Sequence, residues 1–329
     1  MELDNIENIS NSQIDNSRRF YVNQVKPMLE NEFAEYEDRI AVGLAGEGSD
    51  CFGYEDFMSR DHDFGTGVCL WITDEDMQVF GERLDKTYND LIDSHPGNNL
   101  TRRLRERRGV MTIHGFYSSI LGTDCDTKNC SLTENDWKNL DHSCLATAVN
   151  GEVFRDDLGE FSAFRKLLLY YYPDNIWKMR IVNEIHKFSA SLQVNYARCM
   201  SRGDKVAARL CHLHGLEAAM QLYFLMKRVY PPYYKWTYRR LAELDKEQNK
   251  EQNKEGLFSK WILELSETDI DLSNWEGRTY NAKYLNLNDQ VVLLSERLAE
   301  QIARMMMGHG LIDNADPYLE RHIDEIIKG

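Results

Sequence analysis

The spacing of apolar residues changes near residue 158, and this change constrains the fold more than any other feature. From about Asp38 to Asp157, short apolar runs such as RIAVGLAG, GVCLWIT and CLATAVNGEVF alternate with polar or helical stretches, as in a mixed α/β region. From Glu160 onward, long amphipathic segments are bounded by Gly, Pro and Asp, which are typical helix boundaries. We therefore predict an α+β chain, with a small mixed-sheet domain over residues 1–158 and a C-terminal helical bundle over residues 159–329.

The charge of the chain bears on its partners. Lys and Arg number 39 against 54 Asp and Glu, a formal net charge of −15. Such a field repels polyanions, whose binding depends on cations that neutralise phosphates, so a nucleic acid is a poor first choice as partner without being excluded. The one strongly basic run, RRLRERRG at residues 102–109, could meet RNA or a nucleotide. We interpret it first as a solvated helix face that pairs with neighbouring acids.

Three observations favour a cytoplasmic protein with no membrane partner. No apolar run reaches the 18 residues that a membrane span needs. The first residues, MELDNIENISNSQ, lack the basic start and apolar stretch of a signal peptide. The seven cysteines are an odd number without a CxxC pair, which fits reduced thiols better than a disulfide framework. The oligomeric state stays open, with a homodimer among the alternatives.

The stretch AVGLAGEGS, residues 41–49, predicts a strand that runs into glycines. Glycine lets the backbone bend sharply and come close to a ligand. Gly48 and Ser49 would then present backbone N–H groups and a hydroxyl to an anionic phosphate. The alternative is an ordinary tight turn.

A second acidic stretch, SRDHDFG at residues 59–65, follows about a dozen residues later. If a strand begins at Asp61, then Asp61 and Asp63 project to one face while His62 points to the other. Two neighbouring carboxylates repel each other unless a proton or a cation intervenes, and Mg²⁺ prefers such hard oxygen ligands. The alternative is an acidic turn in solvent.

Together the two stretches resemble the hG[GS]…[DE]h[DE] signature of the DNA polymerase β-like nucleotidyltransferase superfamily, with Gly48, Ser49, Asp61 and Asp63 as the matching residues. The sequence GEGSDCFGYEDFMSRDHDFG is similar to the bacterial family described as domain of unknown function 4037. GEVFRDDLGEF, QVNYARCMSRGD and PPYYKW are further similarities to that family. The resemblance covers roughly residues 38–240.

The resemblance implies a magnesium-dependent enzyme that transfers a nucleoside monophosphate from ATP or another nucleoside triphosphate. Asp61 and Asp63 would bind the magnesium ions, and Gly48 and Ser49 would hold the β- and γ-phosphates. Asp156, in VFRDDLG, is our choice for the third carboxylate, which completes the metal site and helps to align and deprotonate the acceptor hydroxyl.

Glu152, in NGEVF, is the alternative for this third position. By strand alternation, residues 152 and 156 would face the same side of one strand. One of the two carboxylates could then be the ligand or base and the other its neighbour.

The helical half would supply the acceptor pocket and further phosphate contacts. At helical spacing Asn195, Arg198 and Arg202 share a face, and the two arginines could meet a triphosphate. Lys235 and Trp236 could meet phosphate and base, by charge and by stacking. The alternatives are a solvated helix face with Arg–Asp pairing and ordinary packing.

Three functions follow from different classes. The leading one is an adenylyltransferase-like enzyme that modifies a hydroxyl of a small molecule, with an aminoglycoside-like cation as one candidate acceptor. The second is nucleotidyl transfer to RNA or protein. The third is a catalytically silent nucleotide-binding module.

Overall fold

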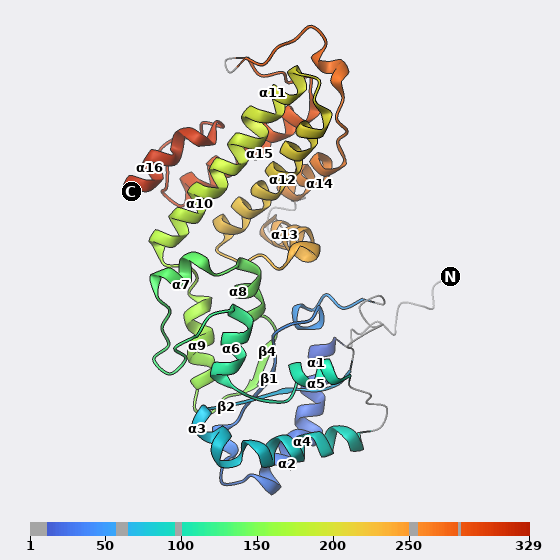
Figure 1. Cartoon of the computed structure of the whole chain (residues 1–329), viewed down its shortest axis with the longest axis vertical. Helices are drawn as coiled ribbons and strands as arrows, with labels where there is room; N and C mark the ends of the chain where they lie inside the picture. Colours follow the sequence, from blue (N-terminus) through green and yellow to red (C-terminus); the bar gives the residue numbers. More distant parts are fainter. Residues whose placement is uncertain (1–11, 57–64, 96–100, 250–255, 282–283) are drawn as a thin grey trace, which may run out of the picture. The chain divides into compact units, whose positions relative to one another are not determined.

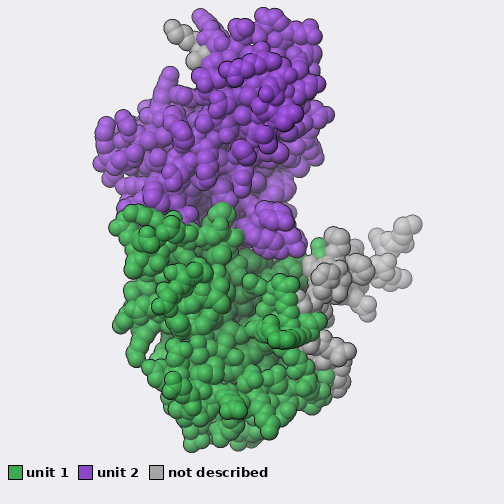
Figure 2. Space-filling view, in the orientation of Figure 1, with its two compact units in different colours: residues 1–171 green, residues 172–329 purple. Residues whose placement is uncertain are grey.

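The structure, a computed structural model, describes residues 12–56, 65–95, 101–249, 256–281 and 284–329. The chain divides into two compact units, residues 1–171 and 172–329 (Figure 2). The first unit contains a four-stranded mixed sheet, and the described part of the second is built from helices and connecting segments (Figure 1). The α+β class that we predicted, with a small mixed sheet and C-terminal helices, is therefore confirmed.

The sheet of unit 1 has the strand order β3-β2-β1-β4. Strand β1 is antiparallel to both of its neighbours, β2 and β4, while β2 and β3 run parallel. The end of β1 therefore lies beside the starts of the other three strands. The strands are β1 (Ala41–Leu44), β2 (Cys69–Ile72), β3 (Val110–Thr112) and β4 (Glu152–Arg155).

The candidate site lies at one of the two ends of this sheet, where strands begin or end. The loop edge comprises the segments beside the end of β1, namely residues 45–50, 65–68, 107–109 and 150–152. The far edge comprises the segments beside the start of β1, namely residues 37–40, 73–76, 113–114 and 156–160.

Helices cover both faces of the sheet (Figure 1). On one face Val42, Leu70 and Ile72 pack into a core with apolar side chains of the N-terminal helices and of α4 (Glu82–Ser94). On the other face the Trp71 ring stacks on Phe161 of α9 (Glu160–Leu169), with ring centroids 3.8 Å apart. It also meets Phe116 of α6 (Ile113–Leu121) edge-on. Burial on both faces explains why β2 reads as the continuous apolar run CLWI rather than as an alternating pattern.

Threonine side chains begin several helices of unit 1. Thr73, Thr101, Thr112 and Thr133 each accept a hydrogen bond from a backbone N–H in the first turn, which satisfies a donor that the helix itself leaves free. The helical segments are α1 (Gln13–Phe20), η1 (Tyr21–Val25), α2 (Lys26–Glu32), η2 (Glu37–Arg39), η3 (Asp50–Phe52), α3 (Asp74–Asp76), η5 (Met77–Gly81), α4 (Glu82–Ser94), α5 (Arg102–Arg107), α6 (Ile113–Leu121), α7 (Glu134–Asn139), α8 (His142–Ala148) and α9 (Glu160–Leu169).

Unit 2 is organised around the long helix α12, which packs against α10, α11, α14 and α15. Gly215 of α12 lets Leu192 approach closely, because a Cβ at this glycine would lie 2.2 Å from Leu192 Cγ. No described helix has the length and apolar character of a membrane span. The segments are α10 (Asp174–Phe188), the π-helix η6 (Ser189–Asn195), α11 (Tyr196–Ser201), α12 (Lys205–Lys227), α13 (Tyr234–Asn249), α14 (Leu257–Glu267), η8 (Leu272–Trp275), α15 (Gln290–Gly308), η9 (Leu319–His322) and α16 (Ile323–Lys328).

Candidate functional site

The loop after β1 has a backbone that requires glycine at two positions. Gly46 has a φ of 107° and Gly48 a φ of 130°, values that a side chain disfavours. At Gly48 an added Cβ would also lie 2.3 Å from Asp50 Oδ1. The glycines of this stretch therefore shape the loop, which turns away from β1 and leads into the short helix η3.

Asn150, two residues before the start of β4, holds this loop. Its Oδ1 accepts a hydrogen bond from Gly46 N at 2.8 Å, and its Nδ2 donates to Gly46 O at 2.7 Å. The Arg165 guanidinium in turn donates to the carbonyls of Val149 and Asn150, at 2.7 and 2.9 Å. Because Asn150 is buried, these bonds are shielded from water and fix the start of the loop.

The tip of the loop presents free donors. Among the described residues, the backbone N–H groups of Gly48 and Ser49 and the Ser49 hydroxyl have no hydrogen-bond partner. Ser49 directly precedes η3, so its neighbourhood resembles the start of a helix. Adjacent backbone N–H groups of this kind form concavities that bind anions.

A buried ion pair connects the loop to β3 and to the start of β2. The carboxylate of Asp50 pairs with Arg108, whose side chain is only 3% exposed. Burial lowers the pKa of Arg108 to about 10, which leaves the guanidinium charged at neutral pH. Arg108 also donates to the carbonyl of Gly65. The Arg108 guanidinium thus binds both the loop, through Asp50, and the chain before β2, through Gly65.

Asp61 and Asp63 lie outside the described residues, in the segment 57–64. The described residues on either side of this segment both bind to Gln13 of α1. Gln13 N donates to Glu55 Oε1, and Gln13 Nε2 donates to Gly65 O, both at 2.7 Å. Glu55 and Gly65, which flank the acidic segment, are therefore both held by one residue of α1.

Glu152 lies at the loop edge, on the other side of β1. It is the first residue of β4 and pairs in register with Leu44, the last residue of β1. Its half-exposed carboxylate forms an ion pair with Arg18 of α1, and the hydrogen bonds that the guanidinium donates to this carboxylate raise the pKa of Arg18. Arg18 also contacts Asp15 at 2.8 Å.

Asp156 lies at the far edge instead. It follows the last residue of β4, Arg155, which pairs with Val42 near the start of β1. Both of its carboxylate oxygens are engaged at the start of α9, where Oδ1 accepts from Gly159 N at 3.0 Å and Oδ2 from Ser162 N at 2.7 Å. Glu152 begins β4 and Asp156 follows its last residue, and a strand of this length spans about 13 Å. Since β4 ends before Asp156, the expected strand alternation does not extend to it.

The other predicted residues belong to unit 2. Asn195 and Arg202 are exposed, and the Arg198 guanidinium lies over the Tyr280 ring, 5.0 Å from its centroid. The Lys235 ammonium lies 5.0 Å from the centroid of the Trp236 ring. Lys235 and Trp236 therefore contact each other at the start of α13, and Arg198 contacts an aromatic side chain.

The basic run is engaged with acidic side chains. Arg102 pairs with Glu106 at 2.9 Å, Arg105 with Asp93, and Arg107 with Glu47 at 2.7 Å. The Arg107 pair brings a further cation to the loop after β1. These contacts agree with the pairing that we inferred for the run, but the sequence pattern did not separate the buried Arg108 from its exposed neighbours.

Within the described part of the chain, no group of three or more His, Cys, Asp or Glu side chains is arranged to hold a metal ion. Asp61 and Asp63 are not among the described residues. The buried thiols near the loop are poor nucleophiles, since burial raises the pKa of Cys51 and brings that of Cys69 to about 12. Carboxylates, guanidinium groups and backbone amides are therefore the chemically useful groups of the loop edge.

Sequence reasoning missed Arg18, Asp50, Arg108 and Asn150. Asn150 had a local signal, because it forms an Asn-Gly pair that marks a turn before a strand. The other three act through contacts with residues distant in the sequence, and no local pattern indicates such partners.

Comparison with known proteins gives a family for part of the chain. Residues 137–237 match the family described as domain of unknown function (DUF4037). The match includes Asn150, Glu152, Arg165 and Arg198, and it ends at the start of α13. No curated protein and no solved structure matches the chain.

Proposed function

We propose that this chain is a metal-dependent nucleotidyltransferase that transfers a nucleoside monophosphate, AMP from ATP, to a hydroxyl group of a small-molecule acceptor. One observation carries the proposal: Gly48 and Ser49, Gly65 directly after the segment with Asp61 and Asp63, and Glu152 of β4 all lie at the loop edge. The resemblance of this arrangement's motifs to the DNA polymerase β-like superfamily supports the same reading.

In this proposal the loop binds the triphosphate. The free N–H groups of Gly48 and Ser49 donate to the β- and γ-phosphate oxygens, and the Ser49 hydroxyl adds a third donor. Asn150 and the Asp50–Arg108 pair keep the loop in one conformation before the nucleotide arrives. Pre-organised donors of this kind lose little entropy on binding and stabilise charge on the leaving pyrophosphate.

The proposed metal ligands are Asp61, Asp63 and Glu152, with Glu152 in the third position that the sequence had offered to Asp156 as first choice. Carboxylate oxygens are the donors that Mg²⁺ prefers. A buried carboxylate oxygen without a protein partner among the described residues, Glu55 Oε2, also lies just before the acidic segment. When bound, magnesium supplies positive charge to the triphosphate during transfer.

Arg18 balances the charge of Glu152. An exposed pair of this kind is worth little in free energy, so a divalent cation can compete with the guanidinium for the carboxylate. Asp156, by contrast, would have to give up two backbone hydrogen bonds at the start of α9. This difference is the reason for assigning the third carboxylate to Glu152.

The test uses ATP labelled at the α-phosphate, Mg²⁺ and a cell extract separated into small molecules, RNA and protein. We expect label in the small-molecule pool, and loss of that label with the Glu152→Gln variant. Glu134→Gln, an exposed carboxylate of α7, is the matched control and should retain transfer. Label in RNA or protein would instead support the macromolecular acceptor, and ATP binding without any labelled product would support a silent module.

A further inference from the structure

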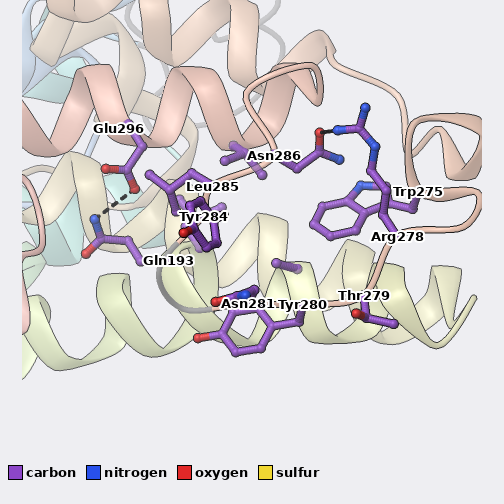
Figure 3. A pocket seen from close by; sticks show the side chains of 13 residues that line it. Gln193, Trp275, Arg278, Thr279, Tyr280, Asn281, Tyr284, Leu285, Asn286 and Glu296 are labelled. Carbon is purple, nitrogen blue, oxygen red and sulfur yellow. Dashed lines mark hydrogen bonds between the residues drawn. The ribbon is translucent and has the colours of Figure 1, made fainter.

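Unit 2 contains a pocket of about 300 Å³ between η6, α11, α15 and the segment that follows η8. Figure 3 shows aromatic side chains between two polar ends of this pocket. Its aromatic lining comes from Trp275, Tyr280 and Tyr284, and Leu192 and Val292 add aliphatic surface. A pocket of this volume and composition suits a small ligand with an apolar body.

Glu296 of α15 forms one end of the pocket (Figure 3). Its Oε1 accepts a hydrogen bond from Gln193 Nε2 at 3.1 Å, and among the described residues it forms no ion pair. Burial raises the pKa of Glu296, because desolvation disfavours the charged carboxylate. A cation that enters the pocket would stabilise the charged form of this carboxylate.

Gln193 is fixed and cannot turn away from Glu296 without losing other bonds. Its Nε2 also donates to Pro317 O at 2.8 Å, and its Oε1 accepts from Ser189 Oγ at 3.0 Å and Leu319 N at 3.3 Å. Gln193 belongs to the π-helix η6, a geometry that often occurs at functional positions. The position of the Glu296 carboxylate is therefore set by an ordered network.

The other end of the pocket holds Arg278, whose guanidinium donates to Asn286 Oδ1 (Figure 3). Arg278 is exposed and already donates to Asn286, so it would bind an anionic ligand more weakly than the half-buried Glu296 carboxylate would bind a cation. It also repels a positive charge from its own end. A ligand cation would therefore be oriented with its charge toward Glu296.

We propose that this pocket binds a small organic cation, a protonated amine on an aromatic or apolar body. The ammonium group pairs with Glu296, and the body lies against Tyr280, Tyr284 and Trp275. Aromatic faces attract cations, and the attraction grows when water is excluded. The proposal concerns unit 2 alone and does not depend on the nucleotidyltransferase activity.

The experiment compares two probes of the same shape, tyramine and 4-ethylphenol, by isothermal titration with the full chain. Only tyramine carries an ammonium group. We expect tyramine to bind at least about tenfold more tightly than 4-ethylphenol, the usual effect of a charged hydrogen bond. The Glu296→Gln variant should remove this preference.

Two further variants keep the result interpretable. Glu300→Gln, on the same helix and exposed beside Arg304, should bind tyramine as the wild type does. Tyr284→Ala, at a position 76% exposed, should weaken binding without affecting folding. Failure of tyramine to bind at millimolar concentration, equal affinity for both probes, or unchanged binding by a folded Glu296→Gln protein would each overturn the proposal.

Discussion

The loop edge and the far edge of the sheet both contain paired charges, but the pairs stabilise different parts of the structure. At the far edge, Asp156 holds the start of α9, and Arg155 pairs with Glu37 and Asp157. At the loop edge, a buried pair and Asn150 brace a loop whose backbone amides remain free, beside the half-exposed Glu152.

The carboxylates of Asp156 and Glu152 differ in the partners that hold them. A carboxylate whose two oxygens accept backbone hydrogen bonds is already satisfied. One that is held by a single exposed guanidinium can exchange this partner for a metal ion. Strand β4 thus begins with a candidate metal ligand, Glu152. It is followed by Asp156, a carboxylate that stabilises the start of α9.

The largest expected effect is on stability, from breaking the buried pair at the loop edge. Arg108→Met leaves Asp50 as an uncompensated buried charge, and we expect a loss of about 3–5 kcal/mol in the free energy of unfolding. Arg155→Met at the far edge breaks more exposed pairs, and we expect about 1 kcal/mol or less. Urea unfolding of both variants measures the difference.

Adding Asp50→Leu to Arg108→Met is the corresponding control. It removes the stranded carboxylate, so it should restore part of the lost stability. Equal losses for the Arg108 and Arg155 variants would contradict the difference that we assign to the two edges.

A smaller effect is expected from two glycines with similar backbone angles. Gly151 at the loop edge has a φ of 66°, and a Cβ there would lie 1.9 Å from Leu44 O. Gly159 beside the far edge has a φ of 74° and open space around it. We expect Gly151→Ala to cost about 2–4 kcal/mol through steric strain, and Gly159→Ala about 1 kcal/mol through its backbone conformation alone.

Thermal unfolding of the two alanine variants measures this contrast. Similar melting temperatures would mean that β1 and β4 can separate at the loop edge without a large loss of free energy. That result would contradict the close packing of β1 against the turn before β4.

The smallest effect concerns Glu160 at the far edge. Burial raises its pKa, and the neighbouring carboxylates of Asp76, Asp156 and Glu75 add to the shift. The folded chain therefore binds more protons than the unfolded chain just above the ordinary glutamate pKa. Through this group, the stability of the fold falls as pH rises across that window and through the raised pKa.

Glu160→Gln removes this titration. We expect the variant to exceed the wild type in unfolding free energy by at most about 0.5 kcal/mol near pH 7, with a smaller pH-dependent advantage near pH 4. Urea titrations at the two pH values check the sign. A variant whose advantage grows as pH falls would show that the charged Glu160 is stabilised rather than destabilised.

The sequence predicted the fold class because its two kinds of apolar spacing correspond to a sheet domain and to helices. It also indicated the glycine turn, since glycine at positions 46 and 48 is required by positive φ angles. Both predictions depend on properties of residues close together in the sequence, which short sequence patterns indicate directly.

The choice between Glu152 and Asp156 could not be made from the sequence, because alternation does not reveal where a strand ends or which neighbour it pairs with. Strand register brings Glu152 beside Leu44, and register depends on tertiary packing. The burial of Arg108 was hidden for the same reason, since its partner Asp50 is distant in the sequence. The positions of Asp61 and Asp63 stay a prediction, as both fall outside the described residues.

Titration of Mg²⁺–ATP into the wild-type, Glu152→Gln and Asp156→Asn proteins tests the assignment of the loop edge most directly, because it requires no knowledge of the acceptor. We expect Glu152→Gln to weaken Mg²⁺–ATP binding by about tenfold or more, while ATP without metal should bind the wild type and this variant alike. Asp156→Asn should lower stability by about 1 kcal/mol and leave nucleotide affinity unchanged. Loss of affinity in folded Asp156→Asn with retention in Glu152→Gln, or no binding to the wild type, would contradict the account.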